Sequence, residues 1–137
     1  MNQAGYSGTP LAKKLGIREG FTIKLVNQPD YYFKLFPDFP TGVKIIADRK
    51  VEKDFIHYFT SSAFQLEKDI KLLRQEIVAN GMIWISWPKK SAKIETDMSE
   101  MVVREAALKN GLVDVKVCAV DEIWSGLKLV IPLKDRK

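Results

Sequence analysis

Apolar and polar residues alternate at period two along several stretches of the chain, which is the pattern of β-strands. Phe21–Val26 alternates in this way, and Asp54–Phe59 is apolar enough to be covered on both faces. Turn residues follow the first stretch at Asn27–Asp30, and Pro88 closes the fourth. The predicted strands are 21–26, 43–47, 54–59, 82–87, 113–120 and 127–131.

Two long helices are predicted from capping residues and from apolar positions repeated every three or four residues. Ser62 and Gln65 fit a capping box at the start of the first helix, and Asn80-Gly81 supplies its end. Its apolar face consists of Leu66, Ile70, Leu73 and Ile77. The second helix is capped by Asp97 with Glu100 and ends at Asn110-Gly111. Its inward residues are Met98, Val102 and Ala106.

Two short helices are also predicted. Thr9 caps the first, Pro10 occupies its first turn and Gly16 ends it. Tyr31–Phe36 forms the second, which Pro37 ends.

Strands that alternate with helices pair in parallel through right-handed crossovers, which places helices on both faces of one sheet. The connection 121–126 between the last two strands is short enough for an antiparallel hairpin. The sequence therefore predicts an α/β fold of three-layer, Rossmann-like type, mostly parallel, with a C-terminal antiparallel hairpin. Lys24 fits poorly in a strand covered on both faces, so either its stem extends to solvent or that strand is less covered.

The 137 residues contain no repeat, charge block or Gly/Ser linker, so we expect a single domain over 1–137, with 1–8 as a flexible segment. A hydrophobic fraction of 46% with 28% charged residues excludes a disordered or fibrous protein. The first residues lack a secretory pattern, and no apolar run is long enough to cross a bilayer. A single cysteine gives no internal disulfide. We therefore expect a soluble, cytoplasmic protein without a membrane partner.

The charge balance is basic, with 22 Lys and Arg against 17 Asp and Glu and a net charge of +5. Basic domains can bind nucleic acid or phosphorylated molecules. The lysines are spread in twos, as at Lys13-Lys14 and Lys89-Lys90, instead of gathering on one helix. This spacing favours a solvated surface over a nucleic-acid interface.

Three motifs resemble a bacterial family of unknown function, the one catalogued as DUF3052. They are Tyr6–Gly16 (YSGTPLAKKLG), Trp84–Lys90 (WISWPKK) and Gly111–Lys128 (GLVDVKVCAVDEIWSGLK). Their order and spacing agree with that family, and the resemblance extends from Tyr6 to Val130. It implies a bacterial source and brings no established activity and no catalytic residues.

The order of predicted elements is also similar to that of S-adenosylmethionine-dependent methyltransferases, with 54–84 resembling the later part of that fold. This resemblance implies a cofactor at the turn after the first strand and a ribose-holding carboxylate about 20 residues further on, where Asp48 lies. The turn itself, Asn27–Asp30, contains no glycine, and Pro29 has no N–H donor. We therefore expect that S-adenosylmethionine is not bound in the usual way.

Isolated chemical groups give no catalytic or metal constellation. His57 is the single histidine and lies inside an apolar strand, which favours a hydrogen-bonded core imidazole over a general base. Cys118 alternates with apolar neighbours in a strand and reads as a small buried hydrophobe. One Cys and one His are too few for a zinc site. The sequence thus predicts no catalytic residue, no metal and no cofactor.

A candidate ligand site follows from the ends of the predicted strands. Ligands of open α/β sheets gather at the carboxyl ends of the strands. Trp87, Lys89 and Lys90 leave the end of a central strand, and two ammonium groups beside an indole suit an anion on a flat ring. The alternative is an exposed lysine loop in which the indole packs against a helix. The remaining candidates are Asp121, Trp124 and Asn27, with Asp30 at the same edge.

Asp121 and its neighbour Glu122 could pair with Lys89 or Lys90, so a structural ion pair is as good an explanation as a binding site. Taken together, these residues predict a non-catalytic module that binds a small anionic ligand on a methyltransferase-like scaffold. The alternatives are a methyltransferase with a remodelled cofactor loop, and an adaptor for nucleic acid or protein that uses the basic surface. The oligomeric state is open.

Overall fold

The computed structural model describes residues 9–136, so the expected flexible segment 1–8 lies outside the described residues. Over this range the chain forms one six-stranded sheet in the order β2-β1-β3-β4-β6-β5. The strands are β1 (Thr22–Val26), β2 (Lys44–Ile45), β3 (Lys53–Phe59), β4 (Ile77–Pro88), β5 (Val113–Ala119) and β6 (Trp124–Val130).

Strands β2, β1, β3 and β4 run parallel, and β6 lies antiparallel to both β4 and β5. The mostly parallel sheet and the terminal hairpin are therefore confirmed. The strands run parallel because each connection between them crosses over the sheet and brings the chain back to the edge where the previous strand began.

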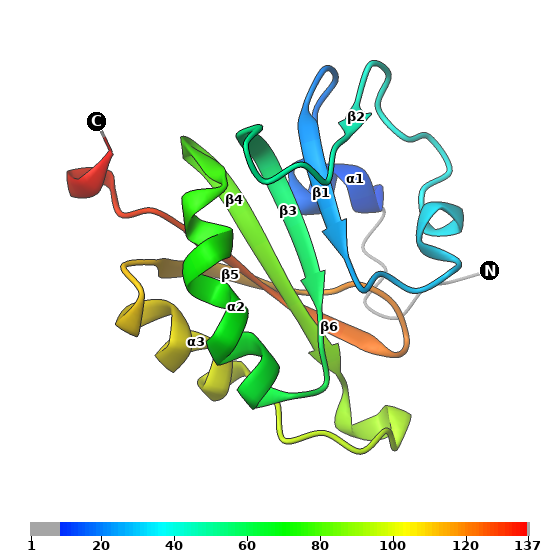
Figure 1. Ribbon diagram of the computed structural model, residues 1–137. Helices are drawn as coiled ribbons and strands as arrows, with labels where there is room; N and C mark the ends of the chain where they lie inside the picture. Colours follow the sequence, from blue (N-terminus) through cyan, green and yellow to red (C-terminus); the bar gives the residue numbers. More distant parts are fainter. Residues whose placement is uncertain (1–8, 137) are drawn as a thin grey trace.

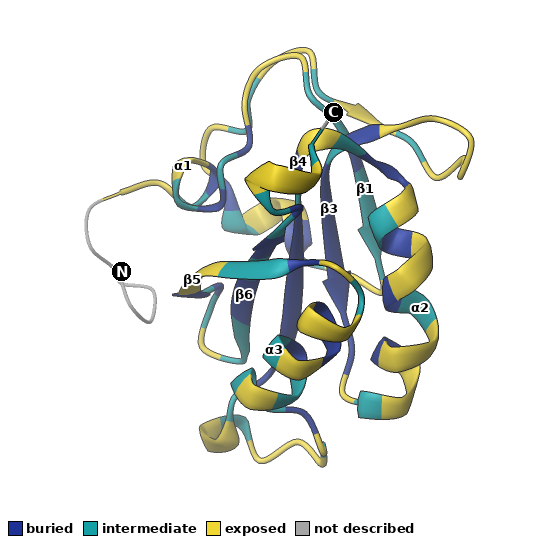
Figure 2. Ribbon diagram, turned by 90° about the vertical axis from the view of Figure 1, so that its left-hand side faces the viewer, coloured by how far each residue is buried: buried dark blue, intermediate teal, exposed yellow. Residues whose placement is uncertain are grey.

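Helices α2 (Ala63–Gln75) and α3 (Glu100–Lys109) cover one face of the sheet, while α1 (Leu11–Leu15) and the 3-10 helix η1 (Tyr32–Leu35) cover the other (Figure 1). Two further 3-10 turns are η2 (Lys90–Ala92) and η3 (Leu133–Asp135). Each face of the sheet has its own apolar cluster, and the central strands between them are buried (Figure 2). This is the three-layer arrangement that the sequence predicts.

The boundary between α2 and β4 differs from the prediction. Ser62 caps α2 as expected, since its hydroxyl accepts a hydrogen bond from the Gln65 N–H at 3.1 Å. The helix ends at Gln75, however, and Ile77 begins β4 opposite Lys53. Asn80-Gly81 therefore lies inside a strand, where the register with β3 shifts. A Cβ at Gly81 would lie 3.1 Å from the Lys53 carbonyl oxygen, so glycine here permits a close backbone approach and does not end a helix.

The caps of the other two helices also differ. The Ser99 hydroxyl caps α3 by accepting from Val102 N–H, whereas Asp97 accepts from Ala63 N–H at the start of α2. Pro10 holds the N-cap position of α1 without a side-chain bond, so Thr9 is not the cap. At α3 another helix takes the capping oxygen of Asp97, and at α1 the helix begins one residue later than Thr9 predicts.

Lys24, which fits poorly in a covered strand, forms an ion pair with Glu76. Its ammonium donates to Glu76 Oε1 at 2.9 Å, and its side chain is 15% exposed. The strand is therefore less covered than a fully central one, as one of the two alternatives predicts.

Candidate functional site

The candidate site is the carboxyl edge of the sheet, which we define as the loops that follow β1, β3 and β4 together with the β5–β6 turn. Strands β1, β3 and β4 end at this edge because they run parallel, and the antiparallel hairpin turns there as well (Figure 1). Asn27, Lys89, Lys90, Asp121 and Trp124 all come from these loops or their first flanking residues. The topology thus brings the predicted loops to one edge.

The turn after β1 has an unusual backbone conformation. Asn27 has φ +58°, in the left-handed region that favours glycine and that asparagine enters more readily than other residues. Its side-chain amide donates to the Phe59 carbonyl oxygen at 3.3 Å, which fixes this turn against the end of β3. A left-handed turn directly after the first strand is therefore present without a glycine.

A hydrogen bond joins this turn to the hairpin. Tyr31 Oη donates to Asp121 Oδ2 at 2.8 Å, and Asp121 Oδ1 accepts from the N–H groups of Ile123 and Trp124, each at 2.8 Å. Burial, and then the bond to Asp121, raise the pKa of Tyr31 to about 12. Asp121 thus shapes the hairpin turn and anchors the first loop. Sequence reasoning misses Tyr31, because the two partners are 90 positions apart.

The two tryptophans of the predicted site lie on opposite faces of the sheet. Trp124 stands edge-on to Phe59, with ring centroids 5.0 Å apart, on the face that α1 and η1 cover. Trp87 is 7% exposed and belongs to the apolar cluster beneath α2 and α3. The pairing of Trp124 with Pro88 explains this separation, because successive strand residues point to opposite faces. Trp87 is a core residue, as the alternative interpretation of this loop predicts.

The two lysines of this loop make no ion pair with the hairpin acids. The Lys89 N–H donates to the Ile123 carbonyl oxygen at 2.8 Å, which holds the backbone of the loop beside the hairpin. Lys89 is half-buried and Lys90 is exposed. Among the described residues neither ammonium has a partner, so the structural ion pair with Asp121 or Glu122, one of the two alternatives, does not form.

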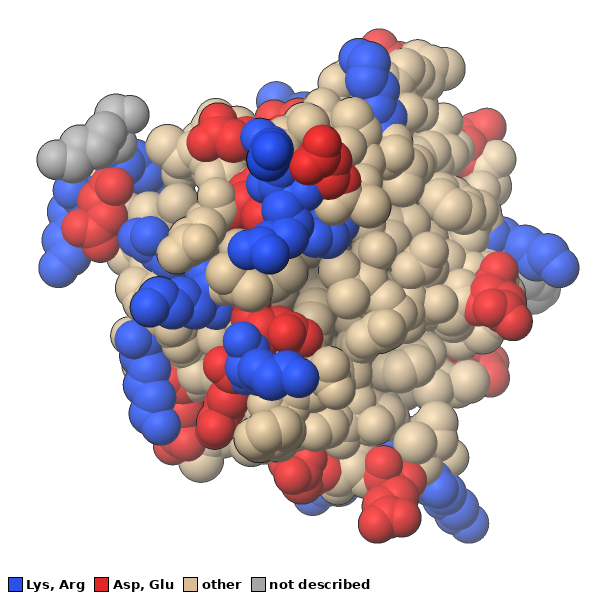
Figure 3. Space-filling view, viewed as in Figure 1, with Lys and Arg blue, Asp and Glu red and all other residues tan. Residues whose placement is uncertain are grey.

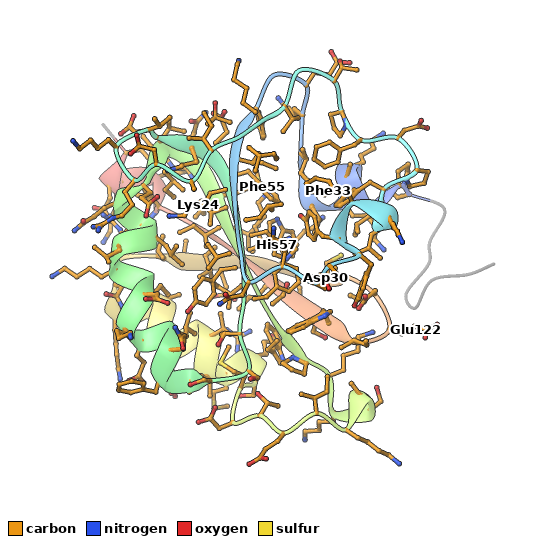
Figure 4. The ribbon with its side chains drawn as sticks, turned by 45° about the vertical axis from the view of Figure 1, so that its right-hand side comes forward. Lys24, Asp30, Phe33, Phe55, His57 and Glu122 are labelled. Atoms are coloured by element: carbon orange, nitrogen blue, oxygen red, sulfur yellow. The ribbon has the colours of Figure 1, made fainter. Side chains whose placement is uncertain are left out.

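His57 lies in a buried chain of hydrogen bonds beneath this edge. Tyr32 Oη lies 2.9 Å from His57 Nδ1, and His57 Nε2 lies 2.7 Å from Ser86 Oγ. Burial lowers the pKa of His57 to about 3, so the imidazole is neutral at physiological pH. In Figure 4 His57 lies in the interior of the molecule, while Asp30 lies in the loop that follows β1. With both ring nitrogens bonded, His57 is a core imidazole and not an accessible base.

Asp48 lies at the opposite edge of the sheet. Strand β2 comprises only Lys44–Ile45, and the chain then returns to the start of β3, where the Lys53 ammonium donates to the Asp48 carbonyl oxygen. Asp48 is therefore far from the turn after β1 and cannot hold a ribose there. The spacing of about 20 residues matches the usual position, but the short second strand ends before it reaches the carboxyl edge.

Cys118 is buried and free, as expected for a small apolar residue. Within residues 9–136, no group of three or more His, Cys, Asp and Glu side chains is placed to hold a metal ion. Over the same range, no helix has both the length and the apolarity that a membrane span requires.

Several solved structures share this fold. A protein described as a type 11 methyltransferase from Sulfolobus solfataricus matches with a TM-score of 0.65 at 16% identity, covering 93% of this chain and 92% of that one. A SAM-dependent methyltransferase from Aquifex aeolicus matches with a TM-score of 0.61 at 16% identity, covering 89% and 88%. LepI in complex with SAM matches with a TM-score of 0.56 at 10% identity; this chain is covered to 90% but spans only 47% of LepI.

These matches define a methyltransferase-like, Rossmann-type fold, and at such identities they establish the fold alone. No family model matches the chain and no curated protein matches it, so the resemblance to DUF3052 is not confirmed. The expectation that leaned against an enzyme is corrected, because the structures that share the fold include those of methyltransferases.

Proposed function

We propose that this protein is an S-adenosylmethionine-dependent methyltransferase that holds its cofactor at the carboxyl edge, against the remodelled turn after β1. The observation that carries the proposal is the left-handed conformation of Asn27, φ +58°, directly after the first strand of a methyltransferase-like sheet. In such folds the phosphate or carboxylate end of a cofactor approaches the backbone of this turn. Asn27 lets the backbone turn after β1 in the left-handed conformation, for which glycine is the usual residue.

The other residues of the turn fit the cofactor in part. Asn27 and Gln28 are exposed, so polar groups of the cofactor could reach this part of the turn from solvent. Pro29 removes one N–H donor, which makes the turn poorer in donors than a glycine-rich loop. The side-chain amide of Gln28 offers a donor in its place, while the Asn27 amide is bonded to Phe59.

A carboxylate for the ribose is present on the turn itself. Asp30 is exposed and its side chain has no partner among the described residues. A carboxylate can accept hydrogen bonds from both hydroxyls of a ribose. Asp48, which follows the second strand, cannot do this here because it lies at the other edge of the sheet. We therefore assign ribose binding to Asp30.

The bound cofactor would supply a methyl group on a sulfonium, and the residues of the chain would bind and orient the two reactants. Lys89 and Lys90 stand free at the same edge, and Trp124 lies on the neighbouring strand. An anionic methyl acceptor would be attracted to these ammonium groups. Such an acceptor would give these two unpaired lysines a role.

Calorimetric titration with S-adenosylmethionine and S-adenosylhomocysteine tests the proposal. Asn27→Gly keeps the left-handed turn and should bind like the parent, whereas Asn27→Val disfavours it and should weaken binding by about tenfold or more. Asp30→Asn should weaken binding to a similar extent, and Asp38→Asn, an exposed acid in the following loop, should not.

Two results would contradict the proposal. One is a parent protein that binds neither compound at about 1 mM. The other is equal affinity of Asn27→Val and Asn27→Gly, because binding would then be independent of the turn.

A further inference from the structure

A cavity of about 500 Å³ opens at the amino edge of the sheet, away from the site described above. It is lined by Asp48, Arg49, Lys50, Leu72, Gln75 and Glu76. The cavity exists because residues 46–52 connect β2 to β3 without a helix, which leaves the corner beside the end of α2 open. Strand β3 separates the two edges by roughly 20 Å at the usual rise per residue.

One of the lining residues, Glu76, belongs to a buried ion-pair group. Glu76 Oε1 accepts from Lys24 and from Lys53, each at 2.9 Å, and Lys24 also reaches Oε2 at 3.1 Å. Lys53 is fully buried. Burial alone would raise the pKa of Glu76, but hydrogen bonds from Lys53 and Lys24 hold it below its ordinary value. Two ammonium groups thus share one carboxylate and leave an excess positive charge in a poorly solvated place.

The rim of the cavity carries one acidic and two basic side chains, and they differ in their hydrogen bonds. Asp48 Oδ1 accepts from the Lys50 N–H at 2.9 Å, and the Asp48 carbonyl oxygen accepts from Lys53. The side chains of Arg49 and Lys50 are exposed and have no partner among the described residues. The lining and the ion-pair group together carry four cations (Arg49, Lys50, Lys24 and Lys53) against the two carboxylates of Asp48 and Glu76, which makes the potential of the cavity positive. Figure 3 shows basic side chains gathered with acidic neighbours over the upper end of α2.

We propose that this cavity binds a small organic phosphate, with the phosphate on Arg49 and Lys50. A guanidinium presents a planar fork of donors that matches phosphate oxygens, and an ammonium adds a point charge. Leu72, 38% exposed, offers an apolar wall for the organic part, and Gln75 offers an amide. The volume lies within the range of small-molecule pockets. This site is independent of the proposed cofactor site.

Phenyl phosphate is the probe, because it joins a phosphate to a ring and does not resemble S-adenosylmethionine. A titration followed by ¹H–¹⁵N correlation spectra should give saturable shifts at the amides of 48–50, 72 and 75. The double variant Arg49→Gln with Lys50→Gln should raise the dissociation constant by about tenfold or more. The matched control, Lys34→Gln with Lys134→Gln, removes two exposed cations elsewhere and should change it less than about twofold.

Three outcomes would overturn the proposal. Equal weakening in both double variants would mean a general charge effect, and shifts at 27–30 or 89–90 would mean binding at the carboxyl edge. The absence of saturable shifts up to about 1 mM would exclude a site of useful affinity. Since none of the residues that line this cavity belongs to the proposed cofactor site, failure here leaves the proposed function unaffected.

Discussion

Trp84 illustrates how much of this fold rests on single side chains. It is fully buried in β4, and its indole N–H donates to the Leu15 carbonyl oxygen at 2.8 Å, so it fixes α1 against the sheet. A Cβ at Gly126 would lie 3.0 Å from the Trp84 ring, which shows how tightly β6 passes it. Sequence pattern places Trp84 in a central strand, and the structure agrees.

Trp84→Ala should lower the free energy of unfolding by about 3–5 kcal/mol, because it leaves a large cavity and an unpaired carbonyl. Urea denaturation measures the loss. Phe64→Ala is the control, since Phe64 is 72% exposed and its removal should change stability by less than about 0.5 kcal/mol. A loss below about 1 kcal/mol for Trp84→Ala would mean that β4 is peripheral.

His57 gives a prediction on pH. Burial lowers its pKa to about 3 in the folded protein, against 6.5 for the free side chain. Between these values the unfolded chain binds a proton that the folded chain excludes. The contribution of the neutral His57 to the free energy of unfolding is therefore complete above pH 6.5. It is lost toward lower pH, by up to about 1.4 kcal/mol per pH unit.

The comparison of the parent with His57→Gln isolates this effect, because glutamine can hydrogen-bond in the same place without titrating. Between about pH 6 and pH 4.5 the stability of the parent should fall more steeply than that of the variant. Parallel stability curves would show that the imidazole is protonated in the folded state.

At the scale of elements, local signals succeed where one segment supplies both partners of a contact. Ser62 and Gln65 lie three positions apart and cap α2 as predicted. Asp97 looks like a cap of the following helix but serves the preceding one, 34 positions away. Asn80-Gly81 looks like a helix end but lies at a register shift of β4. The same residue types satisfy both roles, so pattern alone cannot choose between them.

The loop after β4 gives a prediction at this scale. Lys89→Ala combined with Lys90→Ala should change the melting temperature by less than about 2 °C, because neither ammonium has a partner among the described residues. Asp121→Ala should lower it more, since three hydrogen bonds to Asp121 are lost. Differential scanning calorimetry measures both variants. A large drop for the lysine pair would make the lysines structural and would remove them from the proposed acceptor site.

At the scale of the whole molecule, the predicted carboxyl-edge site is assembled in part. Topology brings Asn27, Lys89, Lys90, Asp121 and Trp124 to one edge, as the alternation of strands and helices predicts. Trp87 faces the other apolar cluster instead. The two tryptophans therefore do not form a common stacking surface. Trp124 pairs with Pro88 and not with Trp87, and neighbouring residues of a strand point to opposite faces of the sheet.

The sequence by itself determined the α/β class, the parallel strands, the terminal hairpin and the buried central strand. These depend on periodicity and on residues close together in the chain. Tertiary structure alone decided that Asp48 lies at the amino edge, that Tyr31 bonds Asp121, and that Glu76 joins Lys24 to Lys53. Such contacts join residues up to 90 positions apart, and strand length, register and crossover path set their distances. A period along the chain carries no information about those three quantities.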